Sequence, residues 1–223
     1  MMFPHFKRYD KVKMKCYITS HACVYHIMNF AISGIQTTEW GQTMYSQVAF
    51  ERSILSKRHK KLREQYLRMI ADLTEEAYIS RYVEGDKLAI FVGSKAMAEE
   101  VVAALKIRYP HLDIRTYLQE NDYSDLLDPD IRVTTILSAG TAHDIPNLRS
   151  AIMTINIDSP VANLQTFGRL REMKHREKDN DVHFYYLYCS SIPKQVEYHE
   201  NKLKLLADRV LSQKKEFLGT LYP

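Results

Sequence analysis

Hydrophobic positions in the middle of the chain change from a strand-like to a helix-like period and back. The segment KLAIFVG at 87–93 is a short apolar run, which predicts a buried strand. Ser94 follows as a candidate N-cap for a helix that extends to about Arg108. The next apolar segment, at 112–118, predicts a second strand. Together these segments predict a strand, a helix and a strand in succession.

The same alternation continues toward the C-terminus. Strands are predicted at 130–137 and 150–157, each after turn-forming residues, and a third at 181–188. Ser159 and Pro160 are an N-cap and a first helical residue, and an amphipathic helix is predicted from about 193 to 217. Strands that alternate with helices need crossover connections. The sequence therefore predicts an α/β fold with a mostly parallel sheet covered on both faces.

A β and loop segment and a long helix precede this region. Residues 12–18 and 23–30 favour strands, and the polar segment SGIQTTEWGQT at 33–43 is typical of a loop. From Tyr45 to Tyr82 the apolar residues recur at helical spacing, which predicts a long helix. This helix carries seven cations: Arg52, Lys57, Arg58, Lys60, Lys61, Arg63 and Arg68. Such a run is either a solvated outer face, the more common case, or a surface that follows phosphates.

Composition places the chain among globular proteins. It has 223 residues, with 31 Lys and Arg against 27 Asp and Glu, so the net charge of +4 permits a nucleic-acid partner without requiring one. An odd number of cysteines, three, indicates free thiols in a reducing compartment, and the cytoplasm is the expected location. No apolar run approaches the length of about eighteen residues that predicts a membrane span, and no secretory signal is recognisable.

Nucleotide-binding loops are missing from this α/β pattern. The chain has no G-x-x-x-x-G-K-[ST] phosphate loop, and the Gly93-Ser94-Lys95 triplet lacks the upstream glycine. It also has no G-x-G-x-x-G and no G-x-S-x-G. A nucleotide-related function would therefore need a partner domain.

The segment SPVANLQTFGRLREMK at 159–174 is the most specific local pattern. Gln165, Gly168, Arg169 and Glu172 follow at i, i+3, i+4 and i+7, which places them on one helical face. A glycine inside a helix costs about 1 kcal/mol relative to alanine. Gly168 lies beside Arg169, which predicts that a ligand or another backbone segment approaches the helix closely there. The alternative is a helix packed on the sheet with an exposed arginine.

Three segments in order resemble the conserved motifs of superfamily-two helicases. Gln165-Thr166-Phe167-Gly168-Arg169 resembles motif VI, Q-x-x-G-R-x-x-R. VTTILSAGTAHDIPNL at 133–148 resembles motif V, and KLAIFVGSKAMAEEVVAAL at 87–105 resembles motif IV. The resemblance implies the second, C-terminal RecA-like lobe, a three-layer α/β/α fold, with Tyr45 to Tyr82 as the preceding helical segment. It is closest in character to phage and bacterial DNA-remodelling helicases, which suggests a phage protein acting in a bacterial cytoplasm.

The resemblance also implies roles for individual residues. ATP with Mg²⁺ binds between two lobes, and the second lobe contributes arginine fingers. The resemblance assigns catalytic roles to Arg169, Gln165 and Arg171, nucleotide contacts to Asp144, Gly168 and Gly140, and nucleic-acid backbone contacts to Thr135, Ser94 and Lys95. The backbone around Gly140 would also face the nucleic acid. DNA or RNA, and a phosphate-loop lobe in cis or in trans, are the implied partners.

The sequence departs from the helicase pattern at several points. The second arginine of motif VI is replaced by Glu172, with Arg171 one position earlier, and the motif V glycine is Ala142. The phosphate-loop lobe is absent, so the chain alone should not hydrolyse ATP. Residues 1–44 are interpreted as a connector or the end of the first lobe, and residues 45–223 as the second lobe with its linker helix. Competing interpretations are a non-catalytic nucleic-acid-binding or regulatory module, and an unrelated nucleotide-binding enzyme.

Two further groups of residues have an alternative structural explanation. The first group consists of two cysteines and two histidines within eleven residues: Cys16, His21, Cys23 and His26. Thiolate and imidazole groups are usual zinc ligands, but the spacing of these residues matches no common zinc finger. Buried cysteines in a hairpin explain it equally well, so no metal site is predicted. The second group consists of aromatic residues in a predicted strand, a residue type on which bases can stack: Tyr185, Tyr186 and Tyr188. Alternating aromatics in a strand more often pack in the core.

Overall fold

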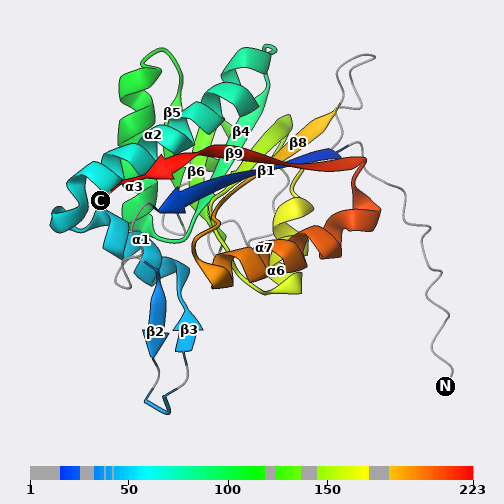
Figure 1. The fold of residues 1–223 in the computed structure, drawn as a ribbon. Coiled ribbons are helices and arrows are strands. Elements are labelled where there is room, and N and C mark those ends of the chain that lie inside the picture. The colour runs from blue at the N-terminus through cyan, green and yellow to red at the C-terminus, as the bar shows by residue number, and fades with distance from the viewer. Residues whose placement is uncertain are drawn as a thin grey trace, which may run out of the picture.

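The computed structural model describes residues 16–25, 33–37, 39–41, 43–118, 124–136, 145–170 and 181–222. Its main feature is a seven-stranded sheet in the order β5-β6-β4-β7-β8-β1-β9 (Figure 1). All six strand pairings in this sheet are parallel. The strands are β1 (Cys16–Tyr25), β4 (Lys87–Val92), β5 (Ile114–Tyr117), β6 (Ile131–Thr135), β7 (Leu148–Met153), β8 (Val182–Cys189) and β9 (Ser212–Leu221). The mostly parallel sheet predicted from the sequence is confirmed.

Helices cover both faces of this sheet, which gives three layers. The helices are α1 (Gln47–Leu55), α2 (Lys60–Ala77), α3 (Lys95–Arg108), α4 (Ser124–Leu127), α6 (Pro160–Phe167) and α7 (Pro193–Leu206), with 3₁₀ turns η2 (Lys57–His59), η3 (Ile79–Arg81) and η4 (Ala207–Arg209). One core cluster joins the sheet to α1, α2 and α3, and a second joins it to α6 and α7. The three-layer α/β/α arrangement is therefore confirmed.

Strand β4 shows why the sequence predicts a sheet buried on both sides. Leu88, Ile90 and Val92 pack in the cluster with α1 to α3, whereas Ala89 and Phe91 pack in the cluster with α6 and α7. Alternate side chains of a strand point to opposite faces, and both faces are covered here. A continuous apolar run is the sequence that such a strand requires.

The C-terminal helix predicted to extend to residue 217 is shorter than expected. Helix α7 ends at Leu206, and β9 then pairs in parallel with β1 at the edge of the sheet. Half of the residues of β9 are exposed, and the strand carries charges such as Lys214 and Glu216, which form an ion pair at 2.6 Å. An exposed edge strand lacks the apolar run of a central strand, so the sequence pattern resembled a solvated helix. The prediction for this segment is wrong.

The first part of the chain also differs from its sequence pattern. Strand β1 lies between β8 and β9, so residues 16–25 belong to the seven-stranded sheet, whereas the predicted division sets residues 1–44 apart. The predicted loop contains an antiparallel hairpin of β2 (Ile35–Thr37) and β3 (Thr43–Tyr45). The predicted long helix is two helices, because Ser56 has an extended ψ of 140° between α1 and α2. Within the described residues no helix is long and apolar enough to cross a membrane.

Candidate functional site

The carboxyl ends of β6, β4 and β7 meet at one edge of the sheet. Val92 at the end of β4 pairs with Thr135 at the end of β6, so Thr135 lies beside the Gly93-Ser94 turn that follows β4. On the other side of β4, strand β7 leads to Ser159 and helix α6. The edge where ligands bind in open α/β sheets therefore carries both predicted backbone contacts, Thr135 and Ser94.

Ser94 begins helix α3 as predicted, but its hydroxyl is already engaged. Its Oγ accepts a bond from Met97 N at 3.2 Å and donates to Glu51 Oε2 at 2.6 Å. Gly93 N donates to Glu51 Oε1 at 2.6 Å. A helix N-terminus favours an anion, and here the anion is a carboxylate of α1. A phosphate at Ser94 would therefore compete with Glu51, whereas Lys95, the first residue of the helix, is exposed.

Gly93 allows helix α1 to approach this turn. A Cβ at this position would lie 2.6 Å from Gln47 Cγ and 3.0 Å from Glu51 Oε1. Contacts that short cannot accommodate a side chain. The glycine of the Gly93-Ser94-Lys95 triplet is therefore explained by packing against α1, without a phosphate loop.

Glu51 is one member of a buried set of hydrogen-bonded side chains, here called the carboxyl-edge network. Its members are Tyr45, Gln47, Glu51, Ser94, Asn156 and Gln195. Gln47 Nε2 donates to Glu51 Oε1 at 3.0 Å and to Thr154 O at 3.1 Å, and Gln47 Oε1 accepts from Asn156 N at 3.1 Å. These bonds tie α1 to the segment that connects β7 to α6.

The rest of the network reaches the hairpin and strand β8. Tyr45 OH donates to Gln47 Oε1 and accepts from Gln195 Nε2, both at 2.8 Å. Gln195 Oε1 accepts from Cys189 N at 2.6 Å. The sequence motifs did not predict this network. The buried stripe of α1 at Phe50 and Ile54, with the polar pair Gln47 and Glu51 on its flank, is the signal that would have pointed to it.

Burial dominates the electrostatics of this network. Glu51 is fully buried, and burial raises the pKa of its carboxyl above the ordinary value of 4.5, although hydrogen bonds from Ser94, Gln47 and the turn amides oppose the rise. Burial likewise raises the pKa of Tyr45 well above 10.0, so its hydroxyl remains protonated. The network thus holds Glu51 in place through donors rather than through a cation.

Helix α6 begins as the sequence predicts and ends earlier. Ser159 Oγ accepts from Ala162 N at 3.3 Å and Pro160 is the first helical residue. Gln165 is exposed, and the helix ends at Phe167 with Gly168 as its C-cap at φ −66°. The prediction that Gly168 lies inside a helix is therefore wrong. The nearest atom to an added Cβ is the helix's own Leu164 O at 3.1 Å, so the described contacts show no close approach by another segment.

Arg169 lies half-buried in the turn after α6. Its N–H donates to Thr166 O at 3.2 Å, so the backbone winds on tightly beyond the helix. Three of the residues predicted to act at the site lie outside the described residues: Arg171, Asp144 and Gly140. The predicted convergence of Thr135, Asp144 and Arg169 therefore stays a prediction.

The two groups with alternative explanations can be placed only where the structure describes them. Cys16 and Cys23 pack in different core clusters, and no group of metal-ligand residues occurs among the described residues. His26 lies outside them, and nothing is described of the His21 side chain. All three tyrosines of β8 are buried, which agrees with core packing: Tyr185, Tyr186 and Tyr188.

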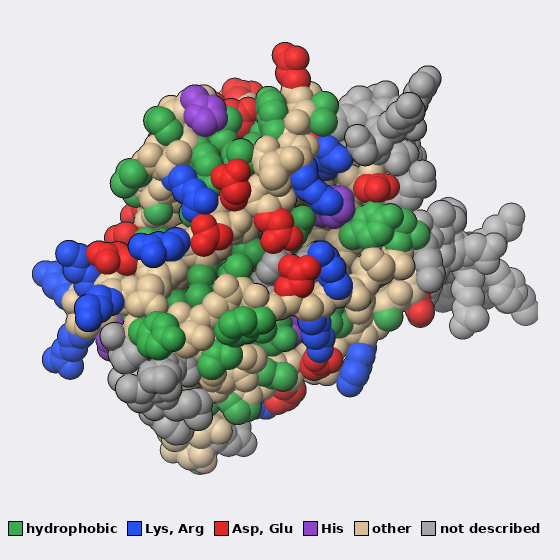
Figure 2. Space-filling model, turned by 45° about the horizontal axis from the view of Figure 1, so that its top comes forward, with side chains coloured by type: hydrophobic (Ala, Val, Ile, Leu, Met, Phe, Trp, Pro, Cys, Tyr) green, Lys and Arg blue, Asp and Glu red, His purple; other side chains and the backbone are tan. Residues whose placement is uncertain are grey.

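A groove of about 530 Å³ opens beside Ser94. It lies between α1 and the start of α3, and its lining residues are Val48, Arg52, Leu55, Ser56, Lys57, Ser94 and Ala96. Among the residues that the structure describes, neither Arg52 nor Lys57 forms an ion pair. Figure 2 shows Lys and Arg side chains gathered at one end of the molecule, over the corner between α1 and α2. This groove therefore offers positive charge to a ligand.

The opposite edge of the sheet also carries many charges, and these are of both signs. Another groove, of about 620 Å³, includes Arg149 and Lys214, whose charges are balanced by Asp86 at 3.0 Å and Glu216 at 2.6 Å. In the same groove, burial and Arg81 lower the pKa of His183 to about 4, which keeps its imidazole neutral. Balanced charges give this groove no preference for a polyanion.

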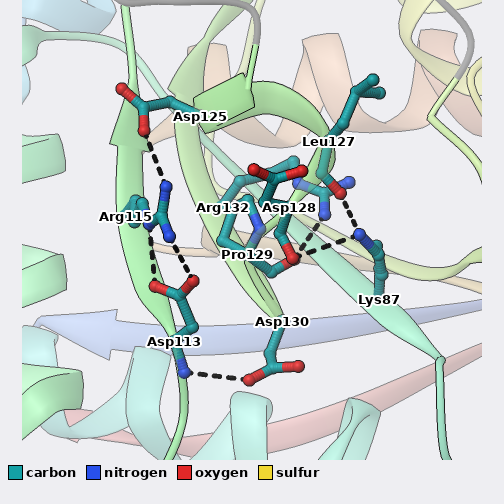
Figure 3. Close-up of polar contacts among 9 residues, drawn as sticks. All are labelled: Lys87, Asp113, Arg115, Asp125, Leu127, Asp128, Pro129, Asp130 and Arg132. Carbon is teal, nitrogen blue, oxygen red and sulfur yellow. Dashed lines mark hydrogen bonds and ion pairs between the residues drawn. The ribbon is translucent and has the colours of Figure 1, made fainter.

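Figure 3 shows a second polar cluster at the amino ends of β4, β5 and β6. Arg115 binds Asp113 at 2.7 Å and Asp125 at 3.0 Å, and Arg132 Nη2 donates to Pro129 O at 2.7 Å. Lys87 Nζ donates to the carbonyls of the same turn. These contacts fix the turn before β6, so we interpret the cluster as structural.

Comparisons with solved structures identify the fold. The chain is similar to T4 UvsW at 10% identity and a TM-score of 0.55, with 92% of this chain and 42% of that chain covered. It is similar to S. cerevisiae Dbp5 L327V bound to Gle1 H337R and IP6 at 11% identity and a TM-score of 0.55, covering 92% and 43% of the two chains. A structure of S. cerevisiae Dbp5 bound to RNA and ADP BeF3 matches at 12% identity and a TM-score of 0.51, covering 94% and 42%.

The likeness is one of fold. No family model matches the sequence, and no curated protein matches it. The chain spans less than half the length of these solved chains. At this identity the comparison shows only the arrangement of strands and helices. The fold is a RecA-like α/β fold.

Proposed function

We propose that the chain is the C-terminal lobe of an ATP-dependent nucleic-acid helicase or translocase. The observation that carries the proposal is the placement of the helicase-like segments on a RecA-like sheet. Thr135 and Ser94 stand at neighbouring strand ends, and Gln165 and Arg169 follow from the next strand through α6. This edge is where open α/β sheets bind ligands.

In this proposal Arg169 is the principal arginine finger. A guanidinium is planar, permanently charged and able to bind phosphate oxygens in pairs, so it suits the charge that develops on a transferring phosphoryl group. The exposed Gln165 would contact the phosphates or the water near them, with Arg171, Asp144, Gly168 and Gly140 completing this half of the site. When bound, ATP would supply the γ-phosphoryl group that is transferred to water, with ADP as the leaving group.

A phosphate-loop lobe must supply the other half of the site. Among the described residues no cluster of three His, Cys, Asp or Glu side chains exists that would hold a metal ion. The chain also has no phosphate-loop sequence. We therefore assign the Mg²⁺ ligands and the phosphate cradle to that lobe, in cis or in trans, and expect no turnover by this chain alone.

Nucleic-acid contacts on this lobe would go to the backbone. Thr135, Ser94 and Lys95 stand at the carboxyl edge, where amides, hydroxyls and an ammonium group suit phosphate oxygens. The solved Dbp5 structure, described as bound to RNA and ADP BeF3, lends support to this part of the proposal. DNA and RNA both fit a surface that contacts phosphates.

One observation favours a second candidate, a non-catalytic nucleic-acid-binding or regulatory module. Glu51 already occupies the amide and hydroxyl donors at Gly93 and Ser94, which a phosphate would otherwise use. Glu172 in place of the second motif VI arginine agrees with a lobe that has lost part of its chemistry. The retained Gln165 and Arg169 favour the catalytic lobe.

Turnover of two arginine variants tests the proposal. With a phosphate-loop lobe supplied, Arg169→Ala should lower ATP turnover by about 10³- to 10⁵-fold, the usual effect of one arginine finger. Arg171→Ala should lower it less. Arg209→Ala, another half-buried arginine, is the matched control and should leave turnover unchanged.

Other outcomes would contradict the assignments. Unchanged turnover in Arg169→Ala would overturn the finger role, and equal severe losses in both variants would make Arg171 a second finger. A folded parent chain that binds nucleic acid, yet supports no turnover with the added lobe, would favour the non-catalytic module.

A further inference from the structure

The hairpin of β2 and β3 stands away from the sheet, below α1 in Figure 1. Its base is anchored, because Ser46 N donates to Gly34 O at 2.8 Å and Tyr45 is buried in the carboxyl-edge network. Gly34 has φ +71°, and an added Cβ would lie 2.7 Å from Phe50 Cβ. The hairpin is thus packed firmly at its base and projects its turn into solvent.

The turn presents the one tryptophan of the chain to solvent. Trp40 is 90% exposed, and Met44 on β3 is 57% exposed. The only charged residue between 33 and 45 is Glu39, so the hairpin itself attracts no phosphate. An indole exposed to water gains none of the large hydrophobic stabilisation that its burial would give. Its position at the tip of an anchored hairpin indicates a contact with a partner that offers a flat or apolar surface.

Unpaired positive charge lies next to the base of the hairpin. Strand β3 leads directly into α1, where Val48 and Arg52 stand one turn apart and line the groove beside Ser94. Lys57 lines the same groove. Among the described residues neither cation has an ion pair. A partner that touches both the tip and the groove should therefore combine an aromatic or apolar face with negative charge.

We propose that the hairpin tip and the groove together bind single-stranded nucleic acid, with an unpaired base stacked on Trp40 and phosphates at Arg52 and Lys57. This inference rests on the proposed function and adds a base contact to it. An aromatic platform beside a cationic groove is the usual arrangement for binding single strands, since every base has a π-face. Strands rise about 3.3 Å per residue, so Trp40 lies within about 17 Å of Tyr45, a distance that a few nucleotides span.

Charge complementarity distinguishes this partner from the alternatives. An apolar surface of a phosphate-loop lobe would match Trp40 and Met44 but would leave Arg52 and Lys57 unpaired. A base-paired duplex offers the indole a stacking surface only at its ends. A single strand satisfies both the tip and the groove.

Tryptophan fluorescence tests the base contact directly, because Trp40 alone contributes the signal. The full chain is titrated with a single-stranded oligothymidylate, and the anisotropy of the labelled oligonucleotide is measured in parallel. Binding should quench the emission, and an abasic oligonucleotide of equal length should quench it far less. Trp40→Ala should weaken binding by about 5- to 150-fold, and Trp40→Phe by much less.

Three further variants complete the test. Phe217→Ala is the matched control, because Phe217 is 66% exposed on β9 and should not change the affinity. Arg52→Gln and Lys57→Gln should each reduce the slope of log affinity against log salt by about 0.7. Circular dichroism verifies that each variant is folded.

The outcomes separate this inference from the proposed function. Oligonucleotide binding without quenching, and with unchanged affinity in Trp40→Ala, would overturn the base contact and leave the lobe's phosphate contacts standing. Loss of association with a phosphate-loop lobe in Trp40→Ala, at unchanged oligonucleotide affinity, would assign the hairpin to a protein partner and overturn the inference. A parent chain that binds no nucleic acid would overturn both.

Discussion

Removing the Glu51 carboxylate should destabilise the fold strongly. Glu51 is fully buried and accepts bonds from Gly93 N at 2.6 Å, Ser94 Oγ at 2.6 Å and Gln47 Nε2 at 3.0 Å. Glu51→Ala leaves these three donors without their carboxylate acceptor. Ser94 is able to rotate toward water and Gln47 retains Thr154 O, so we count about two donors at about 1–3 kcal/mol each. The expected loss is about 2–6 kcal/mol, or about 4–24 °C in Tm for a chain of this size.

Glu51→Gln separates the hydrogen bonds from the charge. The amide retains an acceptor for Gly93 and fills the same volume, so this variant should lose about 1 kcal/mol or less. It also removes a titrating group. Because burial raises the pKa of Glu51 in the folded state, the folded chain holds more protons above pH 4.5, and its stability should fall as pH rises through the interval from 4.5 to the folded value. Glu51→Gln should lack this part of the pH dependence.

Urea unfolding followed by circular dichroism measures both effects. Glu64→Ala is the matched control, since Glu64 lies 56% exposed on α2 with Lys60 at 3.9 Å and should change stability by less than about 0.5 kcal/mol. If Glu51→Ala were as stable as this control, or Glu51→Gln no more stable than Glu51→Ala, the structural role given to the carboxylate would be wrong.

Two other substitutions test the packing around the site. Lys202 is buried with Nζ 2.9 Å from Ile155 O, and burial lowers its pKa from 10.5 to about 7. The folded chain therefore holds fewer protons between these values, so stability should rise with pH across that interval and Lys202→Met should lack the slope in urea unfolding at pH 7 and 9. A slope that persists would contradict the assignment. Gly34→Ala should lower the free energy of unfolding by about 1–3 kcal/mol, because φ is +71° and the new Cβ would press on Phe50. Gly41→Ala is its control and should lower the stability less, because no atom lies within 4 Å of the added Cβ. Thermal melts measure both.

Local patterns in the sequence predicted the framework of the lobe. The apolar run at 87–93, the Ser94 cap and the Ser159-Pro160 start are short-range features, and the structure contains β4, α3 and α6 at those places. A parallel sheet also follows from alternation, because crossover connections leave few other arrangements. These predictions succeeded because burial on both faces and helix capping act on neighbouring residues.

Segments whose environment is set by distant residues were predicted less well. Strand β9 looks helical in isolation, and it is a strand because β1 offers an unpaired edge. Residues 16–25 join the sheet for the same reason, through pairing with β8, more than 150 residues away in the sequence. Strand pairing is a non-local interaction, and exposed edge strands carry little apolar signal of their own.

Short-range patterns were enough to predict the α/β class, the helix caps and the motif-like segments that carry Thr135, Gln165 and Arg169. The packing of the elements in three dimensions sets how these segments are surrounded. It ended α6 before Gly168, and it brought Glu51 of α1 to the turn that was expected to receive a phosphate. Which polar groups face one another depends on how helices dock on the sheet. That docking is set by shape and burial over the whole chain, and no short segment encodes it.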